Sequence, residues 1–164
     1  MTTMRQIQLT EWGDESVLHE ATVPIPSPVR GHVLIKTVAA GVNPIDVTTR
    51  KGLGPAAQLA NPSYRPFVPG WDVAGTVVAT AGDYTGFSVG DGVFGMVTFP
   101  YPGGAYAEYV LVPAYQLAKV PSDVPCAQLG GAPLAALTAY QSLFEVARLK
   151  EGERVLIHAG AGGV

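Results

Sequence analysis

The end of the chain contains a pattern that can bind a phosphate group. The apolar run 155–157 leads directly into a turn made of His158, Ala159, Gly160, Ala161, Gly162, Gly163 and Val164. When a glycine-rich turn follows a strand, its backbone N–H groups can approach nucleotide phosphates at the N-terminus of the next helix. No residues for that helix follow Val164, so the pattern predicts only the entrance of a nucleotide site. The alternative is an ordinary glycine-rich turn.

A second group of polar side chains lies in the segment Asn-Pro-Ile-Asp at 43–46. Asn43 is a favourable residue for the N-cap of a helix, and Pro44 suits the first helical position. Asp46 comes three residues after the cap, where its carboxylate can accept the backbone N–H of Asn43. The segment therefore predicts a capped helix over 43–52. A cap of this kind can also hold both polar side chains at the edge of a cleft.

Composition narrows the kind of protein that carries these groups. Hydrophobic residues make up 48% of the 164 residues and charged residues 14%, which favours a folded core over disorder. The net charge is −3 and the basic residues are scattered, so nucleic acid is not an expected partner. The single cysteine excludes an internal disulfide framework. No apolar run approaches the ~20 residues that span a bilayer, and no signal peptide is recognisable, so we expect a cytoplasmic protein.

The elements that must position these residues begin as a series of short strands. Alternating or β-branched runs between Gly and Pro predict strands over 4–9, 16–28 (ending in a Pro-rich loop), 32–42, 69–82, 89–96, 103–113 and 115–121. An irregular surface loop is expected over 53–68. The pattern changes at Ser122, where we place a domain boundary. A helix over about 133–148, preceded by a shorter one, and a strand at 155–157 are expected beyond it.

Six segments in this order resemble one protein family: AAGVNPID, FVPGWDVAGTV, VGDGVFG, GGAYAEYV, PLAALTAY and GERVLIHAGAGGV. The chain is similar to the N-terminal portion of a zinc-independent quinone oxidoreductase of the medium-chain dehydrogenase/reductase (alcohol dehydrogenase-like) superfamily. The resemblance implies a mainly β fold. Residues 1–122 would form a GroES-like catalytic domain, a partly open β-barrel with short helices. Residues 123–164 would supply the linking helix and the first strand of a truncated NAD(P)-binding Rossmann domain.

Zinc-dependent members of the superfamily bind the catalytic metal at three positions that resemble Asn43, Trp71 and Leu134 here. Of these side chains, an amide oxygen is a weak ligand, and indole and alkyl groups do not bind zinc. We therefore expect no metal site. Without a Lewis acid, hydride transfer is easiest to an acceptor already activated by conjugation, such as a quinone or an α,β-unsaturated carbonyl.

The resemblance also implies roles for individual residues. Asn43, Asp46 and Thr138 would be catalytic, although Thr138 can instead donate to the carbonyl four residues earlier. Thr48 stands where many relatives carry a tyrosine, so Tyr64 is considered in its place. Trp71 would bind substrate as an aromatic wall, or simply pack in the core. The cofactor, NADPH with NADH not excluded, would contact a larger set of residues: Asn43, Thr138, His158, Ala159, Gly160, Ala161, Gly162, Gly163 and Val164.

The expected function is hydride transfer from NADPH to a quinone or enone, in a protein that is a homodimer when intact. The 164-residue chain is expected to be inactive alone, because half of a nucleotide site offers few contacts to offset the cost of immobilising a ligand. Two alternatives remain open. One is an enoyl reductase that acts on thioester-linked chains. The other is a stand-alone, non-catalytic GroES-like domain for binding or oligomerisation.

Overall fold

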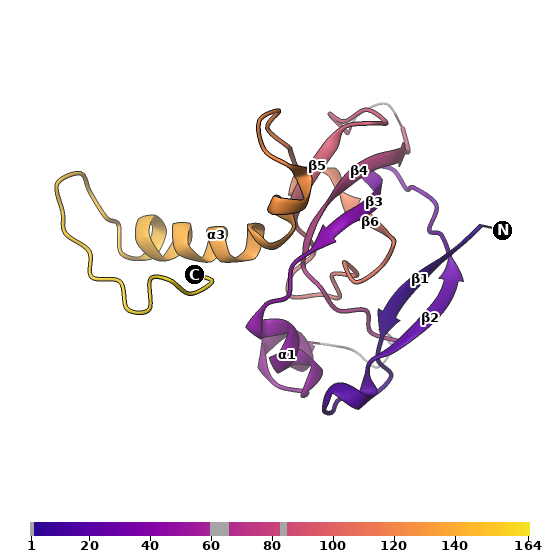
Figure 1. The fold of residues 1–164 in the computed structure, drawn as a ribbon, viewed down its shortest axis with the longest axis horizontal. Helices are drawn as coiled ribbons and strands as arrows, with labels where there is room; N and C mark the ends of the chain where they lie inside the picture. The colour runs from indigo at the N-terminus through magenta and orange to yellow at the C-terminus, as the bar shows by residue number, and fades with distance from the viewer. Residues whose placement is uncertain (1, 60–65, 83–84) are drawn as a thin grey trace.

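The computed structural model describes residues 2–59, 66–82 and 85–164. Two antiparallel sheets and several short helices form one end of the molecule, and a longer helix projects from the other end (Figure 1). The fold is thus mainly β, as the sequence predicts. It also matches the expected partly open barrel with short helices.

The larger sheet provides the main core. Its strands run in the order β6 (Tyr109–Pro113), β3 (His32–Ala40), β4 (Asp72–Thr80), β5 (Gly92–Met96) and β7 (Ala118–Lys119). Neighbouring strands are antiparallel, and β3 pairs with both β4 and β6. The central strands β3 and β4 contain runs of consecutive buried residues, 33–35 and 72–75, whereas β5 alternates between buried and partly buried residues. The β-branched residues in these runs explain why the sequence predicts strands there. The core is formed by Val33, Ile35, Val73, Val77, Val93, Val97, Ala105, Val110 and Val112.

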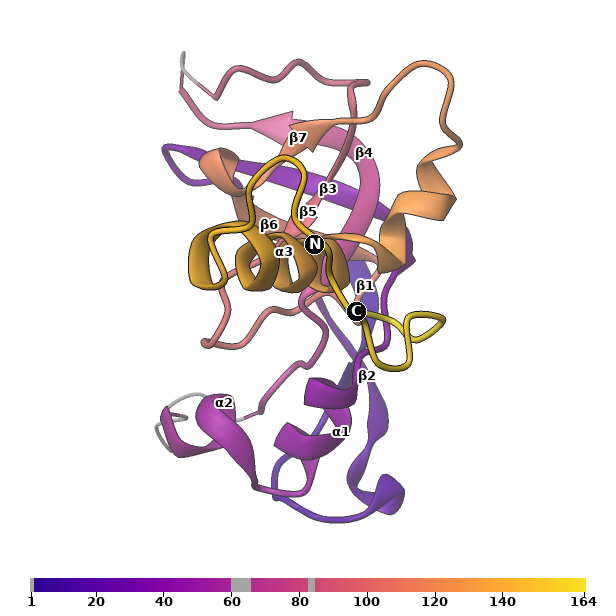
Figure 2. The same ribbon diagram turned by 90° about the vertical axis from the view of Figure 1, so that its left-hand side faces the viewer.

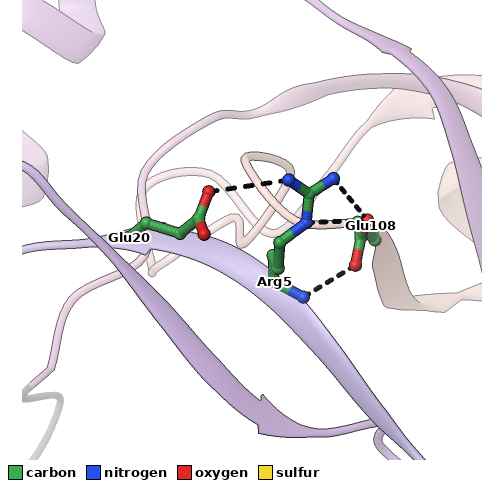
Figure 3. Close-up of polar contacts among 3 residues, drawn as sticks. All are labelled: Arg5, Glu20 and Glu108. Atoms are coloured by element: carbon green, nitrogen blue, oxygen red, sulfur yellow. Dashed lines mark hydrogen bonds and ion pairs between the residues drawn. The ribbon is translucent and has the colours of Figure 1, made fainter.

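The smaller sheet is a hairpin of β1 (Thr3–Gln8) and β2 (His19–Pro24), joined by a turn of 3-10 helix, η1 (Glu15–Val17). Backbone bonds attach it to the segment before β6, because Ile7 N donates to Tyr106 O at 2.8 Å and Glu108 N donates to Arg5 O at 3.0 Å. The Arg5 guanidinium also reaches the carboxylates of Glu108 and Glu20, at 2.8 and 3.8 Å (Figure 3). All three side chains are exposed, so backbone pairing is the main attachment.

A second core lies beneath the helices α1 (Pro44–Arg50) and α2 (Gly54–Leu59), which sit beside the hairpin (Figure 2). It consists of Leu9, Ala56, Phe67 and Trp71. The rings of Phe67 and Trp71 meet edge to face with centroids 6.3 Å apart. The expectation of an irregular loop over 53–68 is wrong for 54–59, which form α2. Ala56 of this helix is buried in that core, and the run Pro-Ala-Ala-Gln-Leu has a high helix propensity that the loop prediction overlooked.

The C-terminal segment is helical and then irregular. A 3-10 helix, η4 (Cys126–Gly131), precedes α3 (Pro133–Tyr140), which continues as a π-helix, η5 (Gln141–Val146). This confirms the expected helix over 133–148 and the shorter one before it. Between β6 and η4 the chain forms another 3-10 turn, η3 (Ala114–Gln116), before β7.

The expected strand at 155–157 is absent from the described structure. Val155, Leu156 and Ile157 are 43%, 82% and 59% exposed and carry no strand pairing. A strand needs a neighbour to accept and donate its backbone hydrogen bonds, and none lies beside this segment. The domain boundary at 122 stays a prediction.

Trp71 offers a test of the second core, because its side chain is fully buried. We expect Trp71→Ala to lower the free energy of unfolding by about 3–5 kcal/mol, the usual cost of removing a buried aromatic ring. Tyr115→Ala, at an aromatic residue that is 85% exposed, is the control and should change it by less than about 0.5 kcal/mol. Urea unfolding followed by circular dichroism measures both. Equal effects would show that the second core contributes little.

Candidate functional site

Asp46 links the start of α1 to the loop before β4. Its Oδ2 accepts the backbone N–H of Asn43 at 2.8 Å, which confirms this part of the predicted cap. Its Oδ1 accepts the backbone N–H of Gly70 at 3.0 Å, so one buried carboxylate joins residues from two segments. The sequence pattern predicts the first bond but not the second, because Gly70 is distant in the chain.

Gly70 is required at this contact by both conformation and space. Its φ is +91°, in the left-handed region that favours glycine, and a Cβ there would lie 2.5 Å from the Tyr106 ring. The Tyr106 hydroxyl is buried near the Asp46 carboxylate. Burial first, and then the negative charge of Asp46, raise the pKa of Tyr106, so the phenol keeps its proton.

Asp72 is the first residue of β4 and is fully buried. Its Oδ2 accepts the side-chain amide Nδ2 of Asn43 at 2.8 Å. Its Oδ1 accepts the backbone N–H of Leu134, near the start of α3, also at 2.8 Å. Asn43 is therefore held by two carboxylates, its backbone by Asp46 and its side chain by Asp72.

Both carboxyl groups have a raised pKa. For Asp46 the dominant cause is burial, which outweighs the opposing hydrogen bonds from the backbone N–H groups of Asn43 and Gly70. For Asp72 burial again dominates, against the bonds from the Asn43 side chain and the Leu134 N–H. The hydrogen bonds favour the charged forms but compensate only part of the lost hydration.

A hollow of about 270 Å³ lies between α1 and α3. Its lining is aliphatic and aromatic apart from one hydroxyl and one amide side chain, and comprises Ile45, Met96, Phe99, Leu134, Leu137, Thr138 and Gln141. The Phe99 ring packs edge to face on Trp71, with centroids 5.5 Å apart, and Trp71 Nε1 donates to Tyr101 O at 2.8 Å. The hollow suits a flat, weakly polar molecule.

The structure brings some of the predicted site residues together. Asn43 and Asp46 belong to the carboxylate network, and Thr138 lines the hollow. The Thr138 hydroxyl donates to Leu134 O at 2.8 Å, the alternative that its helical position allows. Trp71 is buried behind Phe99, so its surroundings support core packing, and its role as a substrate wall stays a prediction. Tyr64 lies outside the described residues.

The predicted nucleotide turn stands apart from this site. Residues 158–164 are exposed, and their backbone bond is local, from Gly162 N to Ala159 O at 2.8 Å. After η5 the chain first runs away from the sheets and then turns back, so that the C-terminus lies beside α3 (Figure 1). Its assignment as a phosphate site stays a prediction.

The sequence-based set of site residues did not include Asp72 or most of the lining of the hollow. A signal for Asp72 was available, since an acidic residue at the start of the apolar run Val-Ala-Gly-Thr-Val-Val must be paired if it is buried. Met96 and Phe99 offered no such signal, because they join the site only when β5 and α3 come together.

The three positions compared with zinc ligands gather around Asp72. Asn43 and Leu134 both donate hydrogen bonds to its carboxylate, and Trp71 precedes it in the chain.

No helix in the part of the chain that the structure describes has the length and apolarity to cross a membrane.

The pH dependence of stability should differ in sign between Asp72 and a partly exposed carboxylate that pairs with a lysine. Because the pKa of Asp72 is raised on folding, its contribution to stability is fully present at acid pH. That contribution falls as the pH rises from about 3.9 through the raised value. Asp91 is the control, because the Lys119 ammonium and then the Ser88 N–H lower its pKa. Its contribution grows with pH over the acid range.

Urea unfolding of the wild type, Asp72→Asn and Asp91→Asn at successive pH values from acid to neutral measures these contributions. The stability difference between wild type and Asp72→Asn should shrink as the pH rises, and that for Asp91→Asn should grow. Differences that change in the same direction would contradict the assigned environments.

Comparison with known proteins places these features in a family. A probable quinone oxidoreductase of Schizosaccharomyces pombe is 39% identical over 160 residues, which cover 96% of this chain and 45% of that protein. The solved quinone oxidoreductase from Coxiella burnetii has 35% identity and a TM-score of 0.88, over 98% of this chain and 50% of its own. Mycobacterial Rv1454c complexed with NADPH has 42% identity and a TM-score of 0.82, over 97% and 45%.

The chain therefore spans half or less of the length of these relatives. Residues 29–122, more than half of the chain, match the alcohol dehydrogenase GroES-like domain. This agreement confirms the resemblance drawn from the six segments. The chain belongs to the alcohol dehydrogenase GroES-like domain family, and its relatives include quinone oxidoreductases of the medium-chain dehydrogenase/reductase superfamily.

Proposed function

We propose that this chain is the N-terminal portion of a zinc-independent oxidoreductase that transfers hydride from NADPH to a quinone or an α,β-unsaturated carbonyl. The observation that carries the proposal is the apolar hollow between α1 and α3, in a chain whose relatives include quinone oxidoreductases. The activity is proposed for the intact protein.

The lining of the hollow supports this class of acceptor. Among the residues that the structure describes, no charged side chain lines it, and Phe99 and Leu137 offer apolar surface to a flat ring. Such a ring is activated by its own conjugation, so its reduction does not require a metal to polarise a carbonyl. The side chains of Asn43, Trp71 and Leu134 support the same conclusion, because they are poor zinc ligands.

The residues present fit one end of the cofactor. A hollow of about 270 Å³ is too small to hold a whole dinucleotide. The Thr138 hydroxyl uses its proton on Leu134 O, so its lone pairs remain to accept from a carboxamide group. Asn43 and Thr138 would hold the nicotinamide end, and Gly160 to Gly163 would approach the phosphates. When bound, NADPH would supply the hydride.

Activity should be tested in the complete protein that the gene encodes. We expect loss of NADPH absorbance on addition of a quinone or an enone, unchanged by a metal chelator. Activity that disappears with the chelator and returns with zinc would overturn the zinc-independent assignment. Turnover of thioester-linked enoyl substrates alone would favour the enoyl reductase alternative. Absence of turnover and of NADPH binding would favour the non-catalytic domain.

A charge introduced into the hollow should weaken substrate binding. Leu137 is 41% exposed, and a substrate bound in the hollow would cover it, so in Leu137→Glu binding would desolvate a carboxylate and we expect KM for the quinone to rise about tenfold or more. Val146→Glu is the matched control, because Val146 follows in the same helical segment, is 81% exposed and does not line the hollow. Equal KM values for the two variants would place the substrate elsewhere.

A further inference from the structure

Asp72 joins three segments that are far apart in the sequence. Its side-chain partners, Asn43 and Leu134, are 29 residues before it and 62 residues after it. Its own carbonyl oxygen accepts the Gly41 N–H at 3.3 Å. The end of β3, the start of α1 and the start of α3 thus meet at one buried residue of β4.

We propose that Asp72 is a positioning residue, whose carboxylate fixes both the orientation of the Asn43 side-chain amide and the position of the N-terminus of α3. Asp72 thereby sets the position of α1 relative to α3, the two helices that line the hollow. The inference rests on the proposed function in one respect, which is that the reaction takes place in the hollow. The two structural consequences can be measured without any turnover.

The orientation of Asn43 follows from the chemistry of its partner. A primary amide has a donor end and an acceptor end, whereas an ionised carboxylate only accepts. Asp72 Oδ2 therefore selects the Nδ2 end of Asn43 and turns the carbonyl oxygen Oδ1 away from itself. An asparagine at position 72 could present its own NH₂ group to Asn43, and the selection would be lost.

The position of the N-terminus of α3 depends on the same carboxylate. The first N–H groups of a helix have no partner within the helix, and Pro133 has no N–H, so Leu134 carries the first one that needs an acceptor. The preceding residue, Ala132, cannot supply a side-chain cap. Asp72 supplies the acceptor from β4, and its negative charge suits the positive end of the helix dipole.

Close packing leaves the carboxylate little freedom. A Cβ on Gly41 would lie 2.7 Å from Asp72 Oδ2 and 2.9 Å from Gly130 O. A Cβ on Gly130 would lie 2.5 Å from the Ala39 Cβ, so η4 lies directly against the end of β3. Gly41→Ala should therefore displace the carboxylate without changing its chemistry. Gly131→Ala is the matched control, because its nearest neighbour would be 4.0 Å away.

The test compares wild type, Asp72→Asn, Asp72→Ala, Gly41→Ala and Gly131→Ala in the protein as its gene encodes it. Nuclear magnetic resonance reports the Asn43 side-chain NH₂ signal, and hydrogen exchange reports protection of the Leu134 amide. In Asp72→Asn the Asn43 signal should lose the downfield shift of a carboxylate-bonded amide proton, while Leu134 protection stays within about threefold, because one oxygen still accepts there. In Asp72→Ala that protection should fall at least tenfold.

Gly41→Ala should change both signals and Gly131→Ala neither, which keeps the test decisive if Asp72→Ala does not fold. An unchanged Asn43 signal in Asp72→Asn, or unchanged Leu134 protection in both Asp72→Ala and Gly41→Ala, overturns the inference.

In the activity assay, Asp72→Asn should lower kcat at least tenfold, while KM stays within about threefold of the wild-type value and the unfolding midpoint stays near that of wild type. Wild-type kcat in that variant also overturns it. A wild-type protein without turnover refutes the proposed function, and the two spectroscopic measurements then decide the inference alone.

Discussion

The fold places a carboxylate where water does not reach, and the site depends on how that charge is compensated. Burial of Asp72 is costly, as its raised pKa indicates, and the cost is tolerated because each oxygen receives a hydrogen bond from a different segment. Removal of either donor would leave a buried charge without its full set of bonds. The end of β3, the start of α1 and the start of α3 are therefore held in one mutual arrangement.

The two cores position the elements that meet at Asp72. The valine-rich core beneath the larger sheet fixes the position of β4, whose first residue is Asp72. The aromatic core beneath α1 and α2 places Trp71, and through it Phe99, beside α3. Side chains of the hollow are thus positioned by contacts formed outside it, which is typical of a preorganised binding site.

Local patterns in the sequence predicted the strands, the capped helix and the helix after Pro133, since each depends on the residue types within it. They failed at 155–157, where a strand depends on a neighbouring strand, and at 54–59, where the loop prediction overlooked a run of residues with high helix propensity. The Asn43–Asp46 bond was predictable because both residues lie in one turn. The Asp72 bonds were not, because they join residues that only the complete sheet brings together.

The Asn43–Pro44 peptide has a consequence for the chemical ageing of the site. Asparagine residues commonly deamidate when the backbone nitrogen of the next residue attacks the side-chain amide. Pro44 carries no N–H at that nitrogen, so this cyclisation is blocked. Conversion of Asn43 to aspartate would add a third carboxylate between those of Asp46 and Asp72, where like charges repel. The proline that starts the helix thus also protects the side-chain amide that Asp72 binds.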